Sequence, residues 1–135
     1  MDDERPPGRP RRALSLSKTA IGARAEAAVV EHLRAAGIEI IATNLRVGRL
    51  ELDVVAREGA VIVIVEVRAR GPGAWVRAMD SVDPKKRARL RAAGEQLWRD
   101  RFASDPSVER MRFDLAAVTL REDGSATIEI AKAVL

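Results

Sequence analysis

Apolar and polar positions follow two different periods along the chain, and the first is that of a helix. From about Thr19 to Ala36, apolar residues recur every three to four positions, as on one face of an amphipathic helix. Thr19 can cap its start, and Gly37 favours an end just past the last turn. The apolar stripe comprises Ile21, Ala25, Val29, Leu33 and Ala36. We therefore expect a first helix that packs through this stripe.

The remaining pattern predicts strands and a second helix. Runs of β-branched and other apolar residues indicate five strands, at 38–47, 50–56, 60–69, 111–120 and 126–133. Arg57-Glu58-Gly59 suits a tight hairpin turn between the second and third strands. Residues 70–79, with two glycines and a proline, suit a loop. Asp83 as N-cap and Pro84 at the first helical position begin a helix that reaches about Arg101. The order αβββαββ predicts an α/β fold in which helices flank a mixed sheet of about five strands.

Composition narrows the class of protein. A chain of 135 residues with 47% hydrophobic residues fits one domain with a real core. The absence of cysteine excludes a disulfide framework, a thiolate nucleophile and a cysteine zinc site, and it suits the cytoplasm. No apolar run approaches the roughly 18 residues that span a bilayer, so we expect no membrane partner. The charged, proline-rich start favours a disordered basic tail over 1–16, followed by a domain over 17–135.

Charged residues interrupt two apolar strands. Glu51 and Asp53 share one face of their strand, as do Glu66 and Arg68 on the next. If the hairpin turn has two residues, all four side chains lie on the same face of the sheet. Carboxylates crowded in this way need compensation, which Mg²⁺ (or Mn²⁺) can supply through oxygen ligands. From the residues alone, an exposed ladder of cross-strand ion pairs is an equal alternative. Glu26, on the border of the first helix's stripe, is either a boundary residue or a further group of such a site.

The second helix begins with a concentration of positive charge. Its first two turns carry Lys85, Lys86, Arg87, Arg89 and Arg91. Cations near a helix N-terminus oppose the macrodipole, so stability alone does not select them. Such a helix start suits phosphate, and a solvated surface is the alternative. The net charge of +4 permits a nucleic-acid partner without requiring one.

Six short motifs, taken together and in order, resemble the YraN-type family. They are Gly22-x-x-x-Glu26, Asn44-x-Arg46, Glu51-Leu52-Asp53, Val65-Glu66-Val67-Arg68-x-Arg70, Val82-Asp83-Pro84-Lys85-Lys86 and Arg112-Phe113-Asp114. That family is regarded as endonuclease-like, distantly similar to Holliday junction resolvases, with the restriction-endonuclease-like PD-(D/E)xK fold. The resemblance covers about residues 19–120.

The resemblance implies roles for individual residues. Asp53 and Glu66 match the metal ligands, and Glu26 and Glu51 match acidic residues near the site. Arg68 falls where the family has lysine, and Leu50 replaces a glycine. The implied catalytic group is Glu26, Glu51, Asp53, Glu66 and Arg68. The residues expected to contact nucleic acid are Arg46, Arg70, Lys85, Lys86, Arg87 and Arg89.

Three functions are consistent with these observations. The first is an Mg²⁺-dependent endonuclease that hydrolyses phosphodiester bonds of DNA, with branched DNA as a candidate substrate. The second is a catalytically impaired nucleic-acid-binding module on the same fold, because arginine at position 68 cannot act as a base. The third is a protein-interaction domain whose charges are merely solvated. Resolvase-like folds often work as dimers, so a homodimer is one expected state.

Overall fold

The computed structural model describes residues 18–70 and 82–135, without the side chains of Lys18 and Arg70. The tail expected over 1–16 and nearly all of the loop expected over 70–79 lie outside this part of the chain. Within it, no helix is both long and apolar enough to cross a membrane.

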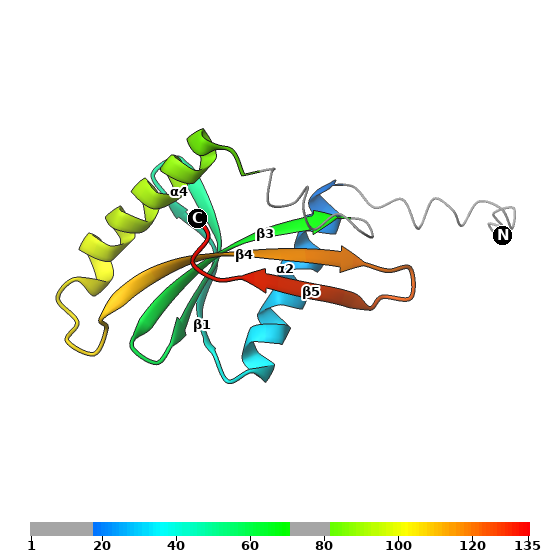
Figure 1. Cartoon of the computed structure of the whole chain (residues 1–135), viewed down its shortest axis with the longest axis horizontal. Coiled ribbons are helices and arrows are strands. Elements are labelled where there is room, and N and C mark those ends of the chain that lie inside the picture. The colour runs from blue at the N-terminus through cyan, green and yellow to red at the C-terminus, as the bar shows by residue number, and fades with distance from the viewer. Residues whose placement is uncertain (1–17, 71–81) are drawn as a thin grey trace, which may run out of the picture.

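A five-stranded mixed sheet forms the centre of the domain (Figure 1). The strands are β1 (Glu39–Val47), β2 (Leu50–Glu58), β3 (Val61–Arg70), β4 (Arg110–Leu120) and β5 (Ala126–Ala131). They lie in the order β1-β2-β3-β4-β5, and neighbours are antiparallel except for β3 and β4, which run parallel. The parallel pair follows from the intervening helix, because a crossover returns the chain to the same end of the sheet.

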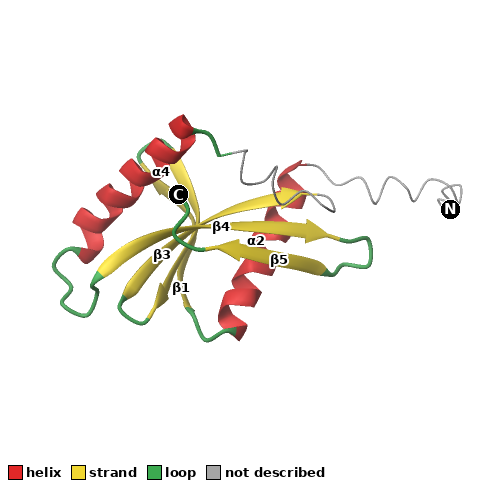
Figure 2. Ribbon diagram, in the orientation of Figure 1, coloured by secondary structure: helices red, strands yellow, loops and turns green. Residues whose placement is uncertain are grey.

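Two helices cover opposite faces of this sheet (Figure 2). They are α2 (Lys18–Ala35) and α4 (Pro84–Leu97), and a π-helical turn, η1 (Trp98–Phe102), follows α4 directly. The stripe of α2 packs on one face through Ala25, Val29 and Leu33, whereas Leu90 and Leu97 of α4 pack on the other. The predicted order αβββαββ and the mixed sheet are therefore confirmed.

The central strand β3 is buried on both faces, as its unbroken apolar run predicts. Ile62 and Ile64 lie in the core under α4, and Val63 and Val65 lie in the core under α2. The hairpin before it differs slightly from expectation. Glu58 pairs with Val61, so the turn consists of Gly59 and Ala60 rather than 57–59. Gly59 has φ +62°, a conformation that glycine adopts without strain.

The second helix and the last strand end earlier than expected. Regular α-helix stops at Leu97, and in η1 the N–H of Ala103 donates to the carbonyl of Trp98 at 2.8 Å. This wider turn brings Phe102 into the core under α4. β5 ends at Ala131 rather than at position 133, because the chain turns at Ala133, where φ is +56°.

Candidate metal and phosphate site

Asp53 lies where β2 and β3 separate. The pairing of these strands runs from Glu58 and Val61 to Val54 and Val65, which places Asp53 next in line opposite Glu66. Beyond that point β3 bonds to a side chain of β2. The N–H of Val67 donates a hydrogen bond to Oδ2 of Asp53 at 2.8 Å. Asp53 is thereby held against β3 beside Glu66, with which its side chain also shares a hydrogen bond. The predicted convergence of these two carboxylates is confirmed.

Strand alternation fails at this same position. Leu52 packs into the core under α4, yet Val54, two residues on, packs into the core under α2. On the neighbouring strand Asn44 adopts φ +50°, so the irregularity involves both strands. The expectation that Glu51 shares a face with Glu66 is therefore wrong, because it assumed unbroken alternation. Glu51 is exposed and interacts electrostatically with Glu26 of α2 instead.

Glu66 is the most confined charge of the site, with 3% of its surface exposed. Its Oε2 lies 3.0 Å from Nη2 of Arg68 and 3.7 Å from Nζ of Lys86. Burial raises the pKa of Glu66 to about 7, the Asp53 carboxylate adds to the rise, and the two cations oppose it. Burial and the Asp53 carboxylate therefore outweigh the two cations, and ionised Glu66 is destabilised in this site.

Glu26 approaches from the face covered by α2. It is half-buried, and its side chain is hydrogen-bonded to Asn44. Burial raises the pKa of Glu26, the nearby Asp53 carboxylate raises it further, and the bond with Asn44 lowers it. The irregular strand pair thus lets Asp53 interact with Glu66 on one side and Glu26 on the other. Asn44 is a member of the site that sequence reasoning missed, although it stands in the Asn44-x-Arg46 motif.

Arg68 brings an unsatisfied donor to the same place. Its Nη2 contacts Glu66, whereas its Nε is buried and has no hydrogen-bond partner in the described part of the chain. A buried donor without an acceptor costs about 1–3 kcal/mol. An oxygen of a bound ligand, placed beside Glu66, would relieve that cost.

The residues predicted to contact nucleic acid fall into three groups. Lys85, Arg87 and Arg89 are exposed on the first turns of α4, as expected of a phosphate-binding surface. Arg46 is exposed on β1 opposite Glu51, and the side chain of Arg70 lies outside the described residues. Lys86 differs from its neighbours, because it turns inward to Glu66. Its contact with nucleic acid stays a prediction, and its inward position depends on how α4 packs on the sheet.

The donor set fits a cation held by few protein ligands. Across residues 18–70 and 82–135, no three His, Asp or Glu side chains form a ready-made metal cage. Mg²⁺ commonly takes only one or two carboxylates, together with water and phosphate oxygens. Asp53 and Glu66 supply two carboxylates whose mutual repulsion such an ion would relieve. These two residues would hold the ion.

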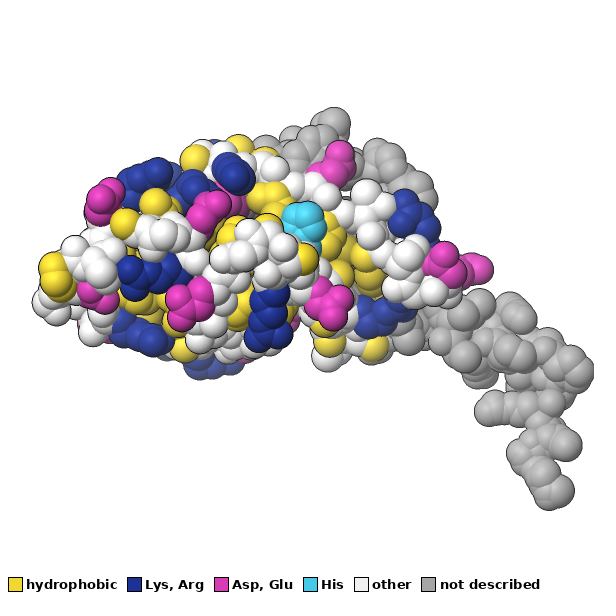
Figure 3. All heavy atoms as spheres, turned by 90° about the horizontal axis from the view of Figure 1, so that it is seen from below, with side chains coloured by type: hydrophobic (Ala, Val, Ile, Leu, Met, Phe, Trp, Pro, Cys, Tyr) yellow, Lys and Arg dark blue, Asp and Glu magenta, His cyan; other side chains and the backbone are white. Residues whose placement is uncertain are grey.

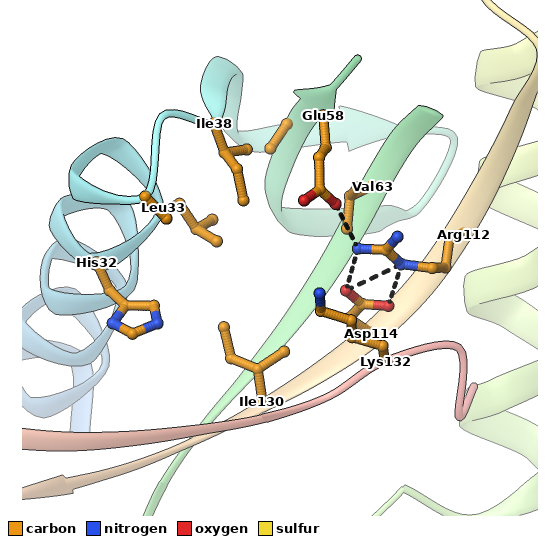
Figure 4. A pocket seen from close by; sticks show the side chains of 11 residues that line it. His32, Leu33, Ile38, Glu58, Val63, Arg112, Asp114, Ile130 and Lys132 are labelled. Carbon is orange, nitrogen blue, oxygen red and sulfur yellow. Dashed lines mark hydrogen bonds and ion pairs between the residues drawn. The ribbon is translucent and has the colours of Figure 1, made fainter. Parts of the chain in front are cut away.

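A second polar cluster lies away from this site, near the C-terminal end of α2 (Figure 4). Arg112 binds the buried Asp114 through a two-pronged contact, with Nε to Oδ1 at 3.0 Å and Nη2 to Oδ2 at 3.1 Å. Asp114 also accepts the N–H of Ala133 at 2.8 Å, which fixes the turn after β5. Glu58 completes the network through Nη2 of Arg112 at 3.2 Å. Arg112 and Asp114 of the Arg112-Phe113-Asp114 motif therefore stabilise the fold, and none of their polar contacts among the described residues involves Asp53 or Glu66.

The network borders a pocket of about 190 Å³. His32 and Lys132 line it together with the network, and the other lining side chains are apolar. On the face seen in Figure 3, Lys and Arg are interspersed with Asp and Glu. This mixture of charges does not single out one class of ligand.

Comparison with known proteins places the chain in a family. The model of the uncharacterised protein family UPF0102 matches residues 25–118, which include Asp53, Glu66, Glu26, Arg68 and Lys86. The chain belongs to the UPF0102 family. A UPF0102 protein of Sorangium cellulosum is 62% identical over 117 residues, which cover 87% of this chain and 81% of that protein.

More distant UPF0102 proteins match over a similar length. The protein of Kineococcus radiotolerans is 37% identical over 84% of this chain and 91% of its own. That of Streptomyces coelicolor is 34% identical over 87% of this chain and 90% of its own. The family relationship therefore spans almost the whole described domain.

Proposed function

We propose that this UPF0102 protein is an Mg²⁺-dependent endonuclease that hydrolyses phosphodiester bonds of DNA. The observation that supports this most directly is the pairing of two acidic side chains with an unsatisfied buried donor. Asp53 and Glu66 share a hydrogen bond. Arg68 contacts Glu66 through Nη2, and its buried Nε has no partner within the described residues. One half of this arrangement suits a divalent cation and the other half suits a phosphate oxygen. The element order and the YraN-type motifs point to the same restriction-endonuclease-like chemistry.

Each residue has a distinct part in this proposal. Asp53 and Glu66 would hold the ion, which would supply Lewis-acid chemistry to the scissile phosphate and to a bound water. Glu26, near Asp53, orders water on the side of α2. Arg68 stays protonated and stabilises the charge that develops on the phosphate. Lys85, Arg87 and Arg89 bind the DNA backbone through charge.

A nuclease assay on linear and branched DNA tests the proposal. We expect cleavage by the wild type with Mg²⁺ or Mn²⁺, none in EDTA, and a loss of at least about 100-fold in Asp53→Asn and Glu66→Gln. Glu122→Gln is the matched control, because Glu122 is exposed in the turn after β4. Equal cleavage by Asp53→Asn and the wild type would exclude the proposed metal chemistry.

A non-catalytic nucleic-acid-binding module is the second candidate, and the arginine at position 68 favours it. A module of this kind binds DNA in a salt-dependent way even after Asp53→Ala, and the wild type does not cut. If Arg68→Lys then cuts where the wild type does not, the natural protein is the impaired form. Binding unaffected by neutralising Lys85 and Arg87 would count against both nucleic-acid functions. A protein-interaction domain with solvated charges would gain no stability from Mg²⁺.

A further inference from the structure

Lys86 is the inward-facing member of the basic start of α4. Its side chain is 29% exposed, and its Nζ lies 3.7 Å from Oε2 of Glu66, whereas Lys85, Arg87 and Arg89 are exposed. The backbone at Lys86 is fixed as well, because its N–H donates to Oδ1 of the N-cap Asp83 at 2.8 Å. The ammonium group is therefore held at the carboxylate site by the helix start.

Lys86 and Arg68 meet at a single oxygen. Arg68 Nη2 contacts the same Glu66 Oε2 at 3.0 Å, so two cations converge on one carboxylate oxygen. Nη2 of Arg68 is at hydrogen-bonding distance from this oxygen, whereas Nζ of Lys86 forms an ion pair with it. An ammonium group carries three N–H donors, and the Nε of Arg68 is buried without a partner among residues 18–70 and 82–135. Two positive groups with spare donors therefore border the position where the carboxylates would hold a cation.

We infer that Lys86 and Arg68 form a two-cation clamp for the phosphate of a nucleic-acid phosphodiester, with Lys86 as a residue that contacts the reacting group. This inference rests on the proposed function and assigns Lys86 a role different from that of Lys85. Glu66 orients both cations, and the Nε of Arg68 and the ammonium of Lys86 donate to the non-bridging oxygens. The clamp supplies positive charge where negative charge develops during phosphodiester cleavage.

Binding of a short phosphodiester tests the clamp without any cleavage. The probe is a thymidine dinucleotide, added to ¹⁵N-labelled full-length protein while the Nε–H resonance of Arg68 is followed by NMR. We expect this resonance to shift in the wild type and in Lys85→Gln, and to lose at least half of its shift in Lys86→Gln. No shift in the wild type, or an equal shift in Lys86→Gln, overturns the clamp. A shift with inorganic phosphate but none with the dinucleotide overturns the phosphodiester assignment.

Single-turnover cleavage gives the second readout. Lys86→Gln should lower the rate at saturating DNA by about 100-fold, the effect of removing one donor to a developing oxyanion. Lys132→Gln is the matched control, and its cleavage rate should stay within about twofold of the wild type. That change is far smaller than the one expected from loss of a donor to the oxyanion. Lys85→Gln should instead weaken DNA binding and lower its salt dependence by about one unit of slope. If Lys86→Gln behaves like Lys85→Gln, Lys86 is an ordinary backbone contact. Absence of wild-type cleavage overturns the endonuclease, and the dinucleotide shift still decides the clamp.

Discussion

Replacement of Glu66 by glutamine should change how the stability of the protein depends on pH. The pKa of Glu66 is raised from its ordinary value of 4.5 to about 7 in the folded protein, chiefly by burial and by Asp53. Between these two values the folded state holds a proton that the unfolded state has released. Stability therefore falls as the pH rises through this window, since the folded state must ionise a carboxyl group that it holds protonated.

The size of this effect follows from the shift. One pKa unit corresponds to 1.36 kcal/mol, so ionised Glu66 costs the folded protein about 3 kcal/mol at high pH. Part of the cost is already present at pH 5, which leaves about 2 to 3 kcal/mol between pH 5 and pH 8. Glu66→Gln carries no ionisable group at this position and should lack this part of the pH dependence.

Urea unfolding in EDTA at pH 5 and pH 8 gives the free energy of unfolding of the wild type and of Glu66→Gln. For each protein we take the loss of unfolding free energy on going from pH 5 to pH 8. The difference between the two losses cancels the contribution of groups that both proteins share. A loss in Glu66→Gln equal to that of the wild type would refute the reasoning. The same measurement at pH 8 is then repeated with Mg²⁺ at about 100 times its Kd. The ion should raise the unfolding free energy of the wild type by about 3 kcal/mol and leave that of Glu66→Gln unchanged.

Three further predictions concern the framework that positions the site, each measured by urea unfolding. Gly94→Ala should destabilise by about 1–3 kcal/mol, because an added Cβ would lie 2.3 Å from Cζ of Phe113. Its control, Gly22→Ala, meets nothing within 4 Å and should stabilise α2 by about 0.5–1 kcal/mol; a stabilising Gly94→Ala would contradict the packing. Asp83→Ala removes the N-cap of α4 and should cost about 1 kcal/mol. Arg112→Met leaves a buried carboxylate unpaired and should cost about 3 to 5 kcal/mol; a cost below 1 kcal/mol would assign the pair no structural role.

The features that the sequence predicts correctly are those that depend on local patterns. The unbroken apolar run of β3 indicates burial on both faces, and Asp83 before Pro84 marks the start of α4. The short hairpin between β2 and β3 then fixes which residues face each other, so the meeting of Asp53 and Glu66 follows from register alone.

The features that were missed depend on contacts between distant segments. A residue count cannot show that alternation breaks between Leu52 and Val54, because the irregularity arises jointly with Asn44 of β1. It also cannot show which of several adjacent cations points inward. Lys86 reaches Glu66 only because α4 packs across the face of the sheet that carries this carboxylate.

The arginine at position 68 is easier to understand from this geometry than from the motif. A lysine there would bring all of its N–H donors to a single nitrogen beside Glu66. An arginine contacts Glu66 through Nη2 and still brings Nε close to this contact, where that atom is buried with no partner in the part of the chain that the structure describes. Since leaving such a donor unsatisfied costs free energy, a ligand oxygen that pairs with it gains affinity by relieving the cost. With Lys86 supplying an ammonium from α4, the pair offers both a fixed planar donor and a mobile charge to one phosphate.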